Sequence, residues 1–266
     1  MGSLVDDEDI ATYQREGVVC LRKVLSGEWL SLLARAIEDN AAHPSVRAKY
    51  TGVGSGQFYN DYNAWRSSEL FRQFLRTSPL AAIAATLWRS ERVSLYGDHI
   101  LIKSPGSSIK TDWHQDLPFW RVEGEQVGSF WMALEPVSLN TGALQFVRGS
   151  HATGTLYNPT GGNVSAQRFA GHEEIPDIET EREKYDIVSF DLQPGDCTFH
   201  HSRMLHAASG NMNPDRPRRA FAVRVAGDDA VYSTKLTNRD VEDETLKHGE
   251  PLVSEKYPLL WRHPTI

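Results

Sequence analysis

The chain has 266 residues and a net charge of −7, with 28 Lys and Arg against 35 Asp and Glu. This length is sufficient for one large domain with a sizeable core, and the acidic balance argues against a general nucleic-acid binder. The two cysteines, Cys20 and Cys197, form no Cys-x-x-Cys pair, which excludes a disulfide framework and a cysteine zinc site. Because no signal-peptide core and no membrane-length apolar run occurs, we expect a soluble cytoplasmic protein.

Roughly the first 90 residues are predicted to be mostly helical. Apolar residues recur at helical spacing, and Gly17 is placed to end the first helix. A short apolar strand, 18–21, interrupts this region. The predicted helices are 6–15, 26–40, 70–75 and 80–87.

From about residue 91 the pattern changes to short β-branched or aromatic segments broken by Pro, Gly and Asn. Many short strands at this spacing favour a sandwich or barrel of the jelly-roll kind, over about 91–228. The polar segment 154–183 is predicted to be a surface insertion, either a solvated loop or a lid. No linker divides the chain, so we expect residues 1–266 to form one domain with a tail at 229–266. The predicted strands are 93–103, 130–137, 142–147, 187–191, 197–201 and 219–225.

The stretch TDWHQDLPFW places His114 and Asp116 two residues apart. On a β-strand both side chains would point to the same face, either to hold a metal or as the accident of a polar strand end. A second strand and turn downstream bring His200, His201 and then His206. Two histidines and one carboxylate with open positions beside them are the facial ligand set of non-heme Fe(II) oxygenases.

This chemistry has a further requirement if 2-oxoglutarate is the co-substrate. Its far carboxylate then needs a fixed cation, and the planar fork of arginine suits a carboxylate. Arg216, Arg218 and Arg219 follow His206 by ten to thirteen residues. The fork chemistry does not choose among the three.

Five blocks of the sequence together resemble the phytanoyl-CoA dioxygenase (PhyH) family of Fe(II)/2-oxoglutarate oxygenases, over roughly residues 8–228. The resemblance implies a mostly β fold with flanking helices, a double-stranded β-helix (cupin-like jelly roll). It also implies Fe(II) held by His114, Asp116 and His206, 2-oxoglutarate bound by Arg218, and O2 as co-substrate. The blocks are YQREGVVCLRKVL, LIKSPGSSIKTDWHQDLPFW, TGALQFVRGSH, LQPGDCTFHHSRMLHAASGN and RPRRAFAVR.

Two further cofactor-binding candidates follow from the resemblance. The family often has His-Gly-Ser after the distal ligand, whereas this chain has His206-Ala-Ala-Ser209, so either Ser209 takes the role of that serine or no residue does. His99 lies where the family often places a polar residue facing the cofactor. The alternative for His99 is a core histidine with a satisfied hydrogen bond.

Several residues around the proposed metal are candidates for a substrate pocket, because such pockets are mostly apolar and aromatic. For each of them the alternative is ordinary core packing, or for the lysine a surface position at a strand end. The candidates are Trp113, Gln115, Phe119, Trp120, Trp131 and Lys103.

The function that these residues predict is a 2-oxoglutarate-dependent dioxygenase of secondary metabolism that hydroxylates an unactivated C–H bond of a small metabolite, with release of succinate and CO2. We expect a small-molecule substrate and neither a nucleic-acid nor a membrane partner. One alternative is a cupin-like metal-dependent hydrolase or isomerase, which would not need Arg218. The other is a non-enzymatic metabolite sensor with a degenerate pocket, although the presence of all four site residues argues against degeneration.

Overall fold

Four α-helices form most of the N-terminal part of the computed structural model, which describes residues 4–52, 56–159, 168–235 and 242–264. The first begins at a capping box between Asp6 and Asp9 and ends at Gly17, whose φ of 77° is left-handed, as predicted. The other three helices are also confirmed, within a few residues at each end. The helices are α1 (Asp7–Glu16), α2 (Gly27–Ala42), α3 (Glu69–Thr77) and α4 (Leu80–Trp88).

The strands form an eight-stranded sheet, a four-stranded sheet and a two-stranded ribbon, and all the pairs are antiparallel. The major sheet has the order β1-β10-β7-β12-β4-β3-β2, with β14 also on β4, and the minor sheet has the order β5-β11-β8-β9. The strands are β1 (Val18–Leu21), β2 (Lys49–Thr51), β3 (Phe58–Tyr62), β4 (Arg92–Lys103), β5 (Thr111–His114), β6 (Val122–Glu123), β7 (Val127–Ala133), β8 (Leu144–Val147), β9 (Ile187–Ser189), β10 (Cys197–His201), β11 (His206–Ala208), β12 (Arg218–Ala226), β13 (Val231–Tyr232) and β14 (Leu259–Arg262).

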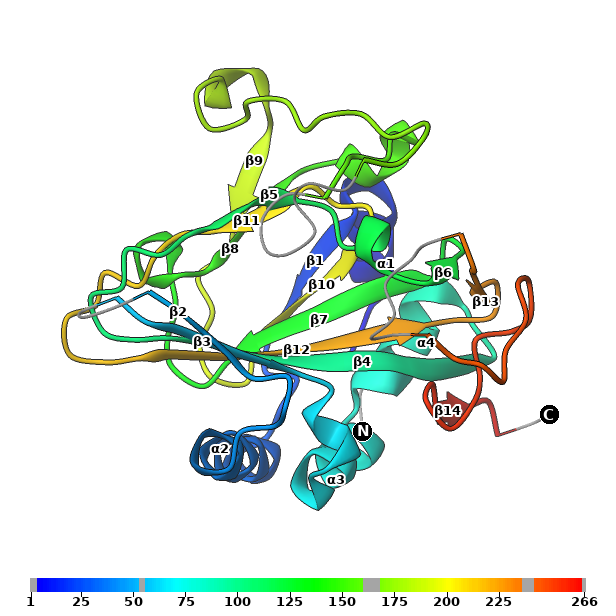
Figure 1. Ribbon diagram of the computed structural model, residues 1–266, viewed down its shortest axis with the longest axis horizontal. Helices are drawn as coiled ribbons and strands as arrows, with labels where there is room; N and C mark the ends of the chain where they lie inside the picture. The colour runs from blue at the N-terminus through cyan, green and yellow to red at the C-terminus, as the bar shows by residue number, and fades with distance from the viewer. Residues whose placement is uncertain (1–3, 53–55, 160–167, 236–241, 265–266) are drawn as a thin grey trace.

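The major sheet separates two layers. Helices α2 and α3 lie on one of its sides and the minor sheet on the other (Figure 1). Along β12, Phe221 and Val223 pack into the core on the helical side, whereas Ala220 and Ala222 face the minor sheet. Two facing antiparallel sheets of this order form the predicted jelly roll.

One part of the fold differs from what the sequence indicated, and the C-terminal tail, for which no element was predicted, contains a strand. β2 and β3 lie inside the region predicted to be mostly helical, and β3 pairs with β4 over Phe58–Tyr62. The pairing with a distant strand decides this conformation, which local spacing does not reveal. In the tail, β14 pairs with β4 and Trp261 packs against the core on the helical side. This part of the tail therefore covers the exterior of the barrel.

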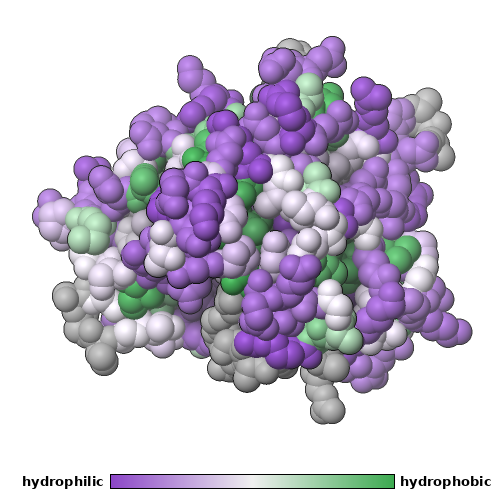
Figure 2. All heavy atoms as spheres, turned by 90° about the horizontal axis from the view of Figure 1, so that it is seen from above, coloured by the Kyte–Doolittle hydropathy of each residue, from purple (hydrophilic) through white to green (hydrophobic). Residues whose placement is uncertain are grey.

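The surface in Figure 2 is largely hydrophilic, with apolar residues in small separate patches. Within the described ranges, none of the helices has both the length and the apolar character needed to cross a membrane.

Candidate metal and co-substrate site

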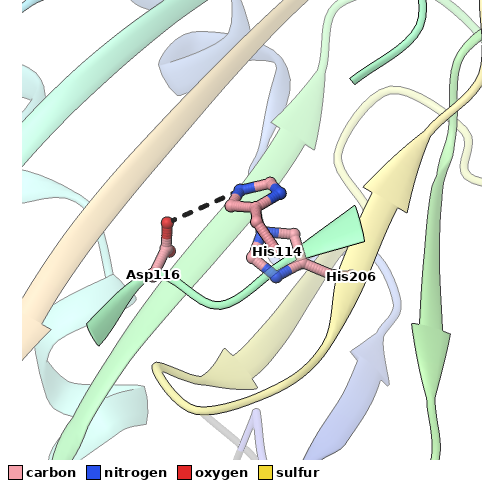
Figure 3. A group of neighbouring side chains, drawn as sticks. All are labelled: His114, Asp116 and His206. Atoms are coloured by element: carbon pink, nitrogen blue, oxygen red, sulfur yellow. Dashed lines mark ion pairs between the residues drawn. The ribbon is translucent and has the colours of Figure 1, made fainter. Parts of the chain in front are cut away.

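The three predicted metal ligands meet where β5 and β11 pair (Figure 3). His114, the last residue of β5, lies directly opposite His206, the first residue of β11, and their ring centroids are 4.1 Å apart. His114 Nε2 lies 4.0 Å from Asp116 Oδ1. One ligand atom from each of the three residues lies within 4.8 Å of the other two. This spacing is compatible with a single ion held by all three.

Asp116 does not lie on the strand, so the expected alternation of strand side chains does not by itself place its carboxylate beside His114. β5 ends at His114, and Asp116 has φ −76° and ψ −43° at the start of a short 3-10 helix, Leu117–Phe119. The backbone amides of Asp116 and Leu117 both donate to the carbonyl of Ser202. The carboxylate reaches His114 because the chain turns back there.

Both imidazoles are oriented by the backbone. His114 Nδ1 lies 2.8 Å from the carbonyl of Asp112, and His206 Nδ1 lies 2.9 Å from that of Met204. A carbonyl only accepts, so each Nδ1 carries the proton and each Nε2 keeps its lone pair for a metal. Burial, and next the neighbouring His114, holds the pKa of His206 well below its usual range. His206 is therefore neutral at physiological pH, as a metal ligand must be.

A row of polar residues across the major sheet faces the Asp116 carboxylate. His200 on β10 and Arg224 on β12 both lie opposite Ser129 on β7. Ser129 Oγ donates to Asp116 Oδ2 at 2.9 Å, and His200 Nε2 lies 3.9 Å from the same oxygen. Burial alone would raise the pKa of Asp116, but Arg224, His200 and the ligand histidines outweigh it and hold that pKa well below its usual range. Asp116 is therefore ionised, with Oδ2 already engaged and Oδ1 left toward His114.

Replacing Ser129 by alanine is expected to weaken metal binding about ten- to hundredfold, because residues that orient a metal ligand typically contribute that much. The measurement is calorimetric titration of the metal-free protein with Co(II), beside Ser202→Ala as a control. Ser202 is also a fully buried serine, but its hydroxyl has no hydrogen-bond partner among the described residues. Equal Co(II) affinity in the wild type and Ser129→Ala would show that Ser129 does not orient Asp116.

A second group of buried cationic side chains lies at the other end of β12. Arg218 is opposite Lys103 on β4. Arg218 Nη1 donates to the carbonyl of Leu101 at 2.9 Å, and its Cζ lies 5.6 Å from the centroid of the Trp131 ring. Its Nε has no hydrogen-bond partner in the described part of the chain. Lys103 Nζ donates to the carbonyl of Ser209 at 2.7 Å.

Burial shifts the protonation of both groups. It lowers the pKa of Arg218 to about 10, which leaves the guanidinium charged at neutral pH. Burial and then Arg218 lower the pKa of Lys103 to about 6. Neither side chain has a salt-bridge partner in the described part of the chain. Because a buried charge without a partner is costly, this end of the barrel suits an anionic ligand.

The geometry distinguishes among the three candidate arginines. Arg216 is exposed, and Arg219 points outward, where its Nε lies 2.6 Å from Glu135 Oε1 and its Nη1 3.1 Å from Glu38 Oε1. Arg218 alone of the three is buried on the inner face. The two other residues predicted to bind 2-oxoglutarate, Ser209 and His99, differ in whether their polar atoms are already hydrogen-bonded. The Ser209 hydroxyl already donates to the carbonyl of Leu139.

His99 lies on β4 within the barrel. Its ring stacks on Tyr62 at 3.8 Å between centroids, and its Nδ1 lies 3.2 Å from Arg224 Nη2. Its Nε2 is buried and has no hydrogen-bond partner within the described ranges. Burial, and next Arg224, holds the pKa of His99 well below its usual range, so the ring is neutral. His99 is thus a buried histidine with one hydrogen bond, to Arg224, and with Nε2 unsatisfied among the described residues, so a role in binding the cofactor stays a prediction.

The six residues predicted for the substrate pocket separate into three pairs. Phe119 lies edge-on to His114, with 6.3 Å between ring centroids, and Trp120 lies under Arg224 at 5.2 Å. Lys103 and Trp131 lie beside Arg218, at the co-substrate end.

Trp113 and Gln115 lie on the opposite face of the minor sheet, so their prediction as pocket residues is wrong. Trp113 packs against Ile178 and donates to Glu179 Oε2 at 3.3 Å. The Gln115 amide bonds to the backbone of Thr155, Arg203 and Tyr157. Strand alternation explains the error, since a neighbour of His114 points away from it. These contacts anchor the described parts of segment 154–183 on the outer face, and residues 160–167 lie outside the described ranges.

Sequence reasoning did not single out Tyr62, Ser129 or Arg224, and it favoured ordinary strand polarity for His200. One signal was available for Arg224, which follows Arg218 by six residues on one strand and must therefore share its inner face. Ser129 and Tyr62 carry no such signal, because only the sheet order brings their strands beside the metal ligands.

A jelly roll that holds two imidazoles, one carboxylate and a buried arginine on its inner faces has the ligand set of a 2-His-1-carboxylate metalloprotein. The sequence profile described as phytanoyl-CoA dioxygenase (PhyH) matches residues 13–220. The chain belongs to this family.

The relatives extend this result. The chain is 24% identical over 166 residues to a phytanoyl-CoA dioxygenase of Arabidopsis thaliana, covering 62% of this chain and 56% of the relative. It is 28% identical over 157 residues to phytanoyl-CoA dioxygenase domain-containing protein 1 of Bos taurus, covering 57% and 51%. The chain thus spans about half the length of these two relatives. The structure of the epimerase SnoN in complex with Fe3+, alpha ketoglutarate and nogalamycin RO is similar with a TM-score of 0.74 at 26% identity, covering 96% of this chain and 98% of SnoN.

Proposed function

We propose that this protein is an Fe(II)- and 2-oxoglutarate-dependent dioxygenase that oxidises a C–H bond of a small-molecule substrate. The observation that carries the proposal is that one barrel contains both the His114–Asp116–His206 cluster and Arg218. Arg218 is a buried cation without a carboxylate partner in the described part of the chain. Membership of the PhyH family supports it, as does the similarity to SnoN, whose structure holds Fe3+ and alpha ketoglutarate. A hydrolase or isomerase would not need the arginine.

The roles of the residues follow from their geometry. When bound, iron and 2-oxoglutarate supply the oxidative chemistry, in which O2 is consumed and succinate and CO2 are released. His114 and His206 offer Nε2 and Asp116 offers Oδ1, which leaves the remaining metal positions open to ligands. Arg218 binds the far carboxylate of 2-oxoglutarate, beside Lys103 and Trp131. Phe119 and Trp120 limit water next to the metal ligands.

The experiment is an anaerobic titration of the metal-free protein with Fe(II) and 2-oxoglutarate, followed by visible absorption. Chelation of Fe(II) by the keto acid is expected to give a metal-to-ligand charge-transfer band, and admission of O2 is then expected to release succinate. A protein that binds the metal without forming this band would be a hydrolase, an isomerase or a sensor instead.

Hydroxylation is the outcome that we propose for the substrate. SnoN is described as an epimerase, so a similar barrel supports another outcome. Mass spectrometry separates the two, because a hydroxylated product gains one oxygen atom and an epimer keeps the mass of its substrate.

Binding of 2-oxoglutarate at pH 7.5 is expected to take up close to one proton. With a pKa of about 6, Lys103 is largely neutral in the free protein, and a carboxylate beside it would raise that pKa and favour the ammonium form. This pKa also affects folding stability, because above pH 6 the folded protein has lost the Lys103 proton whereas the unfolded chain keeps it up to the ordinary lysine pKa. Lys103 therefore makes the free protein more stable as the pH rises above 6.

Calorimetry of 2-oxoglutarate binding in phosphate and in Tris measures the proton, because the two buffers differ in ionisation enthalpy. Lys103→Met is expected to remove the proton uptake, whereas Lys235→Met, at an exposed lysine paired with Glu123, is expected to keep it. Proton uptake that persists in Lys103→Met would place the titrating group elsewhere.

A further inference from the structure

A second arginine of β12 lies on the inner face at the metal end of the barrel. Arg224 follows Arg218 by six residues, about 20 Å along a strand, and shares its side of the sheet. Arg224 Nη2 lies 4.0 Å from Asp116 Oδ1, the carboxylate oxygen that faces His114. Arg218 and Arg224 are thus too far apart to bind the same small carboxylate, and Arg224 is the one beside the metal ligands.

The Arg224 guanidinium is held in one orientation with part of its fork unused. Its Cζ lies 5.7 Å from the centroid of Tyr62 and 5.2 Å from that of Trp120. Its Nη2 meets His99 Nδ1 at 3.2 Å, while its Nε is buried and has no hydrogen-bond partner among the described residues. Two aromatic contacts restrict the plane of the guanidinium before any ligand arrives, which lowers the entropic cost of a bidentate contact.

Asp116 does not form a hydrogen bond with the Arg224 guanidinium. Its Oδ2 is engaged by Ser129, and the 4.0 Å between Oδ1 and Arg224 Nη2 exceeds hydrogen-bonding distance. The charge balance of the site with Fe(II) and 2-oxoglutarate bound also leaves Arg224 without a counter-ion. With Lys103 protonated beside the co-substrate, the positive charges of Fe(II), Arg218 and Lys103 already exceed the three negative charges of 2-oxoglutarate and Asp116, so none of these carboxylates requires Arg224 as its counter-charge. The nearby carboxyl of Asp98 is bonded instead to the backbone amides of Ala64 and Trp65.

Solvent reaches the site from the Arg224 end. The side chains of His114 and Arg224 are 18% and 15% exposed, and Tyr62 and Phe119 are also partly exposed. At the other end Arg218 is 2% exposed and Lys103 is fully buried. A substrate that approaches from this more exposed end would meet Arg224 beside the metal ligands.

We propose that the substrate carries a carboxylate close to the carbon that reacts, and that Arg224 binds this carboxylate. The inference rests on the proposed function and names its substrate class. A charge-assisted bidentate contact at a partly buried site fixes both the position and the orientation of a small molecule. Arg224 is thus the residue that determines specificity, and it is distinct from the co-substrate anchor.

The test uses protein loaded anaerobically with Fe(II) and saturating 2-oxoglutarate. Matched carboxylic acids and primary amides, beginning with benzoate and benzamide and continuing through aromatic and aliphatic pairs, are titrated against the charge-transfer band. In the wild type, acids are expected to bind at least about tenfold more tightly than their amides. Arg224→Gln is expected to bring this ratio close to one. Arg219→Gln, at an outward-facing arginine of the same strand, is expected to preserve it.

Three results would count against the inference. Acids that bind no better than amides to the wild type, including the case in which no pair binds, would exclude a carboxylate subsite. An acid preference that survives in Arg224→Gln would assign the subsite to another residue. A loss of Fe(II) and 2-oxoglutarate affinity in Arg224→Gln that equals the loss of acid binding would show that Arg224 only positions Asp116. If the wild type forms no band before any acid is added, the proposed function itself fails.

Discussion

Replacing His206 by alanine is expected to reduce 2-oxoglutarate turnover to background and to abolish the charge-transfer band. His206 is buried, neutral and oriented by the carbonyl of Met204 through its Nδ1. Its Nε2 is therefore free to bind a metal together with His114 and Asp116. Loss of a ligand is expected to weaken Fe(II) binding by at least the ten- to hundredfold that loss of an orienting residue causes. The measurements are Fe(II) affinity, the visible band and succinate release.

His201→Gln is the matched control for this variant. His201 is also buried, but it points away from the cluster, toward His151, with 5.4 Å between ring centroids. It is expected to keep the band and the turnover, and thermal unfolding of both variants checks that each is folded. Normal Fe(II) affinity and turnover in a folded His206→Ala would refute the proposed metal centre.

Replacing Arg218 by glutamine is expected to weaken 2-oxoglutarate binding about a hundredfold while Fe(II) binding changes little. Hydrogen bonds to a charged group are worth about 1.5–3 kcal/mol, and at this site the buried carboxylate would also lose the arginine charge and keep only Lys103 beside it. Glutamine keeps much of the side-chain volume over Trp131 but removes the charge and the fork. Titration of the Fe(II) protein with 2-oxoglutarate, read from the band, gives the affinity.

Two further variants sharpen this result. Arg218→Lys keeps the charge without the planar fork, so it is expected to restore only part of the affinity. Arg219→Gln removes an arginine that is paired with Glu38 and Glu135 on the outside of the sheet, and it is expected to leave 2-oxoglutarate affinity unchanged. If Arg219→Gln weakens binding more than Arg218→Gln does, the co-substrate anchor is misassigned.

Local sequence chemistry determined much of this protein. The helix α1 could be predicted because Gly17 provides a left-handed end, and the strands of the barrel because β-branched and aromatic residues lie between turn residues. Residue chemistry narrowed the site to a few histidines, carboxylates and arginines, and the resemblance to the PhyH family then singled out His114, Asp116, His206 and Arg218 among them.

Only the tertiary structure decided which candidates act together. Trp113 and Gln115 are adjacent to the ligands in sequence but face away from them, because the strand alternates its side chains. Ser129 and His200 lie far from Asp116 in sequence and meet it because β7 and β10 are neighbours in the sheet. Contacts between distant segments depend on sheet order and register, which are set by burial of the whole inner face and not by any one segment.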